Sequence, residues 1–189
     1  AFIVRERQSG CKQQQLLSGM DIRAYWLSNF VYDLLMYLLV AVPGFLACMV
    51  FNIESLTKDG ALFFTGLNFL LFGLAGLPFT YLCGFLFVDY GMAQAVFYFI
   101  NFAMGSILPT VVVILRVVGG NGASTALSAC WLLRLLPVFS FGEVLMNLAS
   151  RQELQNSSTE QLTANSLTMP SLLYLVGSAL LYSGLLMLS

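Results

Sequence analysis

Residues 5–23 read RERQSGCKQQQLLSGMDIR and hold half of the positive charge of the chain. The segment lies between a short apolar stretch, residues 1–4, and a long apolar run that starts near Tyr25. Short loops rich in Lys and Arg stay on the cytoplasmic side of a membrane, because moving their charges across the bilayer is unfavourable. The segment therefore predicts a membrane protein whose residues 5–23 face the cytosol. Of the eight Lys and Arg, four lie here: Arg5, Arg7, Lys12 and Arg23.

The composition is that of a protein embedded in lipid. The chain has 189 residues, of which 59% are hydrophobic and 9% are charged, and its mean hydropathy is +0.85. Soluble domains carry about 25% charged residues. The net charge of -1 gives no basic field of the kind that attracts nucleic acid. We therefore expect an integral, multi-pass membrane protein that is surrounded by membrane lipids and has no nucleic-acid partner.

No arrangement of residues in the sequence predicts chemistry. There is no His, no glycine-rich loop of the form GxxxxGK followed by Ser or Thr, and no nucleophile with a nearby base. The four cysteines are scattered without a CxxC pair, which is typical of isolated thiols packed in a bilayer. We therefore predict no catalytic, metal or cofactor site in this chain. The cysteines are Cys11, Cys48, Cys83 and Cys130.

Apolar runs divide the chain into expected membrane spans, since a helix needs about 20 apolar residues to cross the ~30 Å hydrocarbon core. The second run would reach roughly 42 Å as a helix, so we expect it to tilt or to bend near Gly73, Gly76 or Pro78. The chain starts and stops inside apolar stretches, and we expect a piece of a larger polypeptide. The expected spans are 27–51, 61–88, 92–118 and 171–189, and residues 1–4 are the end of an earlier span.

Residues 123–149 break this pattern. They form two apolar pieces, 123–136 and 141–149, each too short to span, which meet at the Pro- and Gly-containing stretch 137–142. Such a pair predicts a re-entrant hairpin. Its candidate functional residues are Arg134, Pro137, Gly142 and Glu143.

The alternative is one kinked span over residues 125–148. It would bury Arg134 and Glu143 near the middle of the membrane at considerable cost, and so we favour the hairpin, in which both charged groups reach water or one another near the outer face. Alternation of the spans then places residues 150–169 outside. Asn156, in an Asn-Ser-Ser sequon, is a candidate glycosylation site on that side.

Asp33 allows two interpretations. With Asn29 and Tyr32 it would line a polar path through the first complete span. One turn above the cytosolic segment, it would instead cap the helix or extend its carboxylate to the membrane interface, and we favour this second interpretation.

Three motifs resemble the second transmembrane half of ABC transporters of the A subfamily, the lipid exporters. The motifs occur in the family's order and cover nearly the whole chain. The first joins Arg5-Glu6-Arg7, Leu17-Ser18-Gly19 and YWLSNFVYD at 25–33. The second is Gly73 with Pro78-Phe79-Thr80-Tyr81, and the third is LPVFSFGEVL at 136–145. The chain departs from the family pattern at Glu143-Val144 and in a short loop at 119–124.

The resemblance implies an all-α polytopic transmembrane helical bundle of the exporter type (ABC-2-like), with a cytosolic coupling helix within residues 5–24 and an outer re-entrant hairpin. In the full-length protein, ATP and Mg would be bound by nucleotide-binding domains, and this chain itself would hold no cofactor. Its partners would be those domains and the other transmembrane half, on the same polypeptide. The residues implied in coupling are Glu6, Arg7, Lys12 and Gly19.

Two other classes of protein are alternatives to the transporter. A stand-alone polytopic scaffold or channel-like protein, without ATP use, is the alternative that the residues leave open. A membrane-embedded enzyme is disfavoured because the sequence shows no catalytic constellation.

Overall fold

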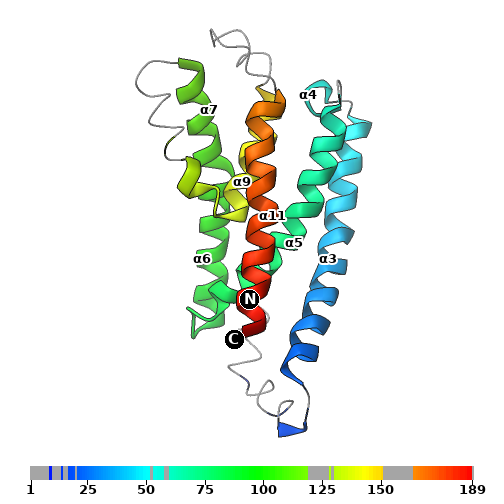
Figure 1. The fold of residues 1–189 in the computed structure, drawn as a ribbon, viewed down its shortest axis with the longest axis vertical. Helices are drawn as coiled ribbons and strands as arrows, with labels where there is room; N and C mark the ends of the chain where they lie inside the picture. Colours follow the sequence, from blue (N-terminus) through cyan, green and yellow to red (C-terminus); the bar gives the residue numbers. More distant parts are fainter. Residues whose placement is uncertain are drawn as a thin grey trace.

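The computed structural model is a bundle of long helices that run side by side along its longest axis (Figure 1). Within the part of the chain that it describes, the structure contains helices and turns and no β-strand. The described residues are 9, 14, 17–19, 21–51, 53–57, 60–118, 128, 130–150 and 164–188.

The first long helix, α3 (Ile22–Val50), begins five residues before the expected span at 27. The reason is Asp21, whose carboxylate accepts a hydrogen bond from the backbone N–H of Arg23 at 3.2 Å. A side-chain oxygen at this position satisfies one of the free N–H groups of the first turn. The helix continues through Pro43 and has 29 residues, which corresponds to about 43 Å.

A short helix, α4 (Glu54–Thr57), connects α3 to α5 (Ala61–Gly84). Gly60 precedes α5 with φ of 79°, a left-handed conformation that glycine adopts without steric cost. The expected span at 61–88 is too long by four residues, because the chain turns at Phe85 and Leu86. At 24 residues α5 reaches about 36 Å.

The next span is one column of three helical pieces: α6 (Tyr90–Phe102), the π-helical turn η1 (Ala103–Ile107) and α7 (Leu108–Val118). Asp89 caps α6 through a hydrogen bond from the Met92 N–H at 3.1 Å. The π turn was not predicted. Pro109 explains it, because its ring would collide with the carbonyl of Gly105 in a regular α-helix, and the wider turn relieves this contact.

The last two helices are α9 (Pro137–Ala149) and α11 (Ala164–Leu188). The predicted junction at 137–142 was wrong: the turn lies at residues 134–136, and Pro137 is the first residue of α9. Proline favours this position, since the first N–H groups of a helix have no partner within it. The last helix begins seven residues before the expected 171, with Pro170 in its interior.

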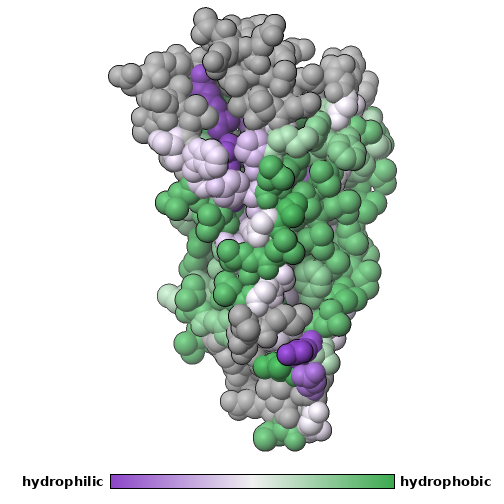
Figure 2. Space-filling view, viewed as in Figure 1, coloured by the Kyte–Doolittle hydropathy of each residue, from purple (hydrophilic) through white to green (hydrophobic). Residues whose placement is uncertain are grey.

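Four helical stretches are long and apolar enough to cross a membrane: Ile22–Val50, Ala61–Gly84, Tyr90–Arg116 and Thr168–Leu186. Figure 2 shows hydrophobic surface over the middle of the bundle and strongly hydrophilic patches toward its two ends. These features confirm an all-α polytopic membrane protein.

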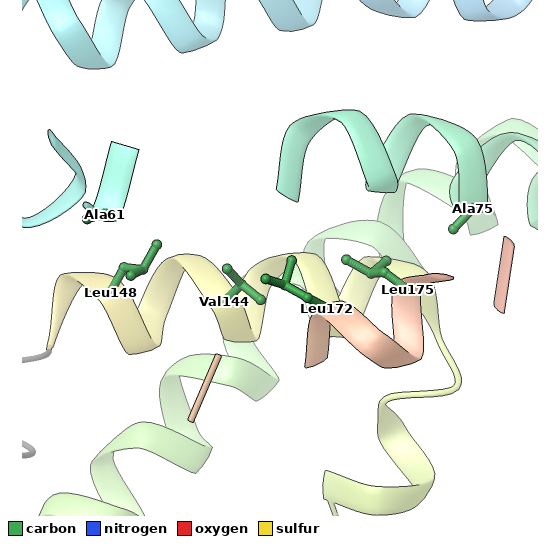
Figure 3. Packing of buried hydrophobic residues seen from close by; sticks show 6 residues of the cluster. All are labelled: Ala61, Ala75, Val144, Leu148, Leu172 and Leu175. Atoms are coloured by element: carbon green, nitrogen blue, oxygen red, sulfur yellow. The ribbon is translucent and has the colours of Figure 1, made fainter. Parts of the chain in front are cut away.

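The main core joins α5, α9 and α11 (Figure 3). Figure 1 shows that α9 lies at the same end of the bundle as α4 and the C-terminal part of α7, which we call the α4 end. A second cluster, around Tyr25, Trp26 and Tyr81, holds α3 against α5 at the opposite end. The core residues in Figure 3 are Ala61, Ala75, Val144, Leu148, Leu172 and Leu175.

Candidate functional site

Three charged side chains meet at the α4 end, and we call them the charged trio: Arg116 of α7, Arg134 of the turn and Glu143 of α9. Nε and Nη2 of Arg134 donate to the two carboxylate oxygens of Glu143 at 2.8 and 2.9 Å. Nη2 of Arg116 donates to Oε1 of the same carboxylate at 2.6 Å. One carboxylate therefore joins two separate parts of the chain to α9.

Polar side chains complete the hydrogen bonds around the trio. Ser171 of α11 donates its hydroxyl to Oε2 of Glu143 at 2.7 Å, and Arg116 donates to Oδ1 of Asn147 at 3.0 Å. Arg116 also contacts Sγ of Cys130 at 3.2 Å. The network thus joins α7, α9, α11 and the turn at this end.

The charged trio is almost completely removed from solvent. The exposed fractions of its side chains are 5% for Arg116, 6% for Arg134 and 0% for Glu143. Charges in such a place are tolerated only when they are paired and hydrogen-bonded. Of the two outcomes expected from the sequence, contact with water or with one another, the structure has the second.

The fold of the hairpin brings the trio together. The Ser140 hydroxyl donates to the backbone carbonyl of Arg134 at 2.8 Å and ties the start of α9 to the turn. Gly142 is buried against η1, where an added Cβ would overlap the carbonyl oxygen of Gly105 and lie 2.9 Å from Cγ of Pro109. This close approach sets the next residue, Glu143, between the two arginines.

A second polar contact crosses the bundle nearer its other end. The Tyr81 hydroxyl of α5 donates to Oδ2 of Asp33 in α3 at 2.5 Å and lies 3.2 Å from the carbonyl oxygen of Asn29. The predicted capping role of Asp33 was wrong, because Asp21 caps this helix. Asp33 instead links α3 to α5, while Tyr32 is exposed.

The predicted site residues fall into two groups. The structure brings Arg134, Pro137, Gly142 and Glu143 together in the hairpin. Of the predicted coupling residues it describes Gly19, which has φ of 91°. The other predicted positions lie outside the described residues: Glu6, Arg7, Lys12 and Asn156.

Arg116 was missed. It lies in the predicted span 92–118 and is the one Lys or Arg in that range. An isolated charge inside a predicted span is a signal of function or of pairing, and this rule would have identified it.

The fold and the buried network define a polytopic membrane domain in which a short hairpin is docked into one end of a helical bundle. The profile of the family described as ABC-2 family transporter protein matches residues 1–188. The chain belongs to this family of transporter proteins.

Individual relatives support the same assignment. The chain is 32% identical over 157 residues, 80% of its length, to the human glucosylceramide transporter ABCA12. It is 30% identical over 178 residues, 93% of its length, to ABC transporter A family member 11 of Dictyostelium discoideum. It is 30% identical over 114 residues, 60% of its length, to the human phospholipid-transporting ATPase ABCA3. These matches confirm the resemblance to the A subfamily.

The chain spans only a small part of these relatives: 6% of the length of ABCA12, 20% of the Dictyostelium protein and 7% of ABCA3. The activity of the whole protein therefore enters below as a proposal.

Proposed function

We propose that this chain is the membrane-spanning part of an ATP-driven ABC transporter that moves lipids. The observation that carries the proposal is the family match over residues 1–188. The names of two relatives, a glucosylceramide transporter and a phospholipid-transporting ATPase, support lipid as the class of substrate.

The chain's own role is to transmit motion. Residues 5–24 form the coupling segment, which docks on a nucleotide-binding domain through Glu6, Arg7 and Lys12. Gly19, within this segment, has a left-handed φ of 91°, and α3 begins three residues later at Ile22. A short segment joined closely to a 29-residue helix supports the proposal, because coupling between distant sites needs a contiguous element with two discrete positions.

The remaining partners follow from this role. Nucleotide-binding domains on the same polypeptide bind ATP and Mg, and the other transmembrane half completes the lipid path. The coupling segment lies in the cytosol, and so the α4 end, with the hairpin, lies on the outer side. The sequon at Asn156 belongs to that side too.

The test exchanges two charges in the full-length protein. Glu6→Arg combined with Arg7→Glu keeps the total charge and the count of basic residues, so membrane orientation is preserved. Solvated surface charges contribute little to stability, and we place both residues in the cytosolic coupling segment, so the double variant should insert and purify normally. We expect lipid-stimulated ATPase activity and transport to be lost while basal ATPase activity remains.

A solvated loop that only sets orientation predicts a different result. It would leave stimulated ATPase activity and transport unchanged in the exchanged variant, and that outcome would refute the coupling role. A panel of lipids in the same assay, with wild-type protein, identifies which of them stimulate ATP hydrolysis. No stimulation by any lipid would refute the proposed substrate class.

A further inference from the structure

The charged trio carries one positive charge more than it can neutralise. Arg116 and Arg134 contribute two guanidinium groups, and Glu143 is the one acid paired with either of them in the described part of the chain. In addition, Nε of Arg116 is buried and has no hydrogen-bond partner there. A buried excess positive charge and an unused hydrogen-bond donor are both costly. An anion bound at the trio would offset both costs.

The trio lies near the ends of two candidate membrane spans. Arg116 is the last residue of one candidate span, and Ser171, which bonds to Glu143, is near the start of another. Arg134 lies over the ring of Trp131, 5.9 Å from its centroid, and Trp131 is 59% exposed. Exposed Trp is typical of the membrane–water interface, which is where lipid phosphates are found.

An apolar cavity follows α11, and Trp131 connects its lining to Arg134 of the trio. Its volume is about 360 Å³, which is within the usual range for ligand pockets. At the end nearer the trio, Tyr174 in the lining contacts Trp131 with ring centroids 6.0 Å apart. The lining continues along α11 past the middle of the span to Tyr182, whose hydroxyl donates to the backbone carbonyl of Leu135 at 2.8 Å.

We propose that this is a phospholipid site, with the lipid phosphate at Arg116 and Arg134 and one acyl chain in the cavity along α11. The phosphate supplies the missing negative charge, and arginine is suited to phosphate because its planar N–H groups match the phosphate oxygens. The cavity runs along α11 from Tyr174, which contacts Trp131, and the acyl chain of the same lipid would lie in it. The inference goes beyond the proposed transport function, because it holds whether the bound lipid is moved or stays in place.

The test measures lipid binding to the full-length protein in detergent by native mass spectrometry. The probes are dioleoylphosphatidylcholine, dioleoylglycerol, which has the same acyl chains without the phosphate, and inorganic phosphate, which has no chains. We expect one phosphatidylcholine to bind more tightly than dioleoylglycerol by about tenfold or more, the size of one hydrogen bond to a charged group. Equal binding of the two lipids to the wild-type protein would overturn the proposal.

Two pairs of variants locate the site. Arg116→Gln leaves the Arg134–Glu143 pair neutral and intact, and should abolish the preference for phosphatidylcholine. Arg23→Gln removes an exposed charge in the first turn of α3 and should leave the preference for phosphatidylcholine unchanged. Gly177→Leu fills the cavity, since nothing lies within 4 Å of a Cβ added at Gly177.

Gly184→Leu is the matched control, because Gly184 also lies in α11 with open space around it but does not line the cavity. We expect Gly177→Leu to weaken phosphatidylcholine binding and Gly184→Leu to have no effect. Equal binding by both variants, or a preference retained in Arg116→Gln, would overturn the lipid site. Binding of inorganic phosphate that saturates the site, without any effect of Gly177→Leu, would overturn it in favour of a free anion.

Discussion

Gly142 of α9 lies so close to Gly105 of η1 that a Cβ at position 142 would overlap the Gly105 carbonyl oxygen. The contact joins two features that have separate causes in the sequence: a π turn that accommodates Pro109, and a helix that starts at Pro137. It sets the distance between the hairpin and the α6–η1–α7 span, and with it the position of Glu143 relative to Arg116.

Gly142→Ala should therefore loosen the hairpin. The backbone oxygen of Gly105 and the ring of Pro109 cannot move away as a flexible side chain would, so we expect a loss of about 1–3 kcal/mol in stability, as for other overpacked sites. Thermal unfolding of the purified protein measures it. Gly177→Ala is the control, because an added methyl meets no atom within 4 Å there. Equal melting temperatures for the two variants would contradict the close packing.

The long helices were predictable because their signal is simple. A run of apolar residues longer than the bilayer core identifies a span whatever its neighbours are, and four candidate spans appear where the sequence indicated them. The ends were less accurate, since they depend on single residues. Asp21 extends α3 toward its N-terminus, and the turn at Phe85 shortens the following helix.

The charged trio could be predicted only in part. Arg134 and Glu143 were recognised as costly in the membrane, and their pairing follows from nearness in the sequence. Arg116 is 27 residues from Glu143, and its partner depends on how α7 packs against α9. That packing rests on η1, and a π turn has no clear pattern in a single sequence.

Glu143 should be the most sensitive residue of the hairpin. Glu143→Gln leaves two buried guanidinium groups without a carboxylate, and breaking a buried ion pair in this way costs about 3–5 kcal/mol. We expect a large fall in melting temperature and in the yield of monodisperse protein. Size-exclusion chromatography after a thermal challenge measures both effects.

Removing the whole trio should be far less harmful. The triple variant Arg116→Met, Arg134→Met, Glu143→Met buries no charge, and apolar replacements of buried ion networks range from neutral to stabilising by about 1–4 kcal/mol. A triple variant as unstable as Glu143→Gln would show that the charges themselves hold the hairpin in place.

Tyr81→Phe should weaken the contact between α3 and α5. It removes the hydroxyl that donates to Asp33 and leaves that carboxylate without this donor inside the span, at a cost of about 1–3 kcal/mol. Tyr32→Phe, at an exposed position one residue from Asp33, is the control. Thermal unfolding of the two variants should differ. If both melt like the wild type, the Tyr81–Asp33 bond contributes no net stability.

The orientation of the bundle can be tested with single cysteines placed beyond the two ends of α3. Gln14 precedes this helix, Ser55 follows it, and both are exposed. In a variant whose four native cysteines are replaced by serine, Gln14→Cys and Ser55→Cys should react with a membrane-impermeant maleimide from opposite sides of intact cells. Because residues 5–23 carry four basic charges, which resist translocation, Gln14→Cys should react only after the membrane is opened. Ser55→Cys should react in intact cells. The same reactivity at both positions would mean that α3 does not cross the bilayer, and a reversed pattern would place the hairpin and its charged trio on the cytosolic side.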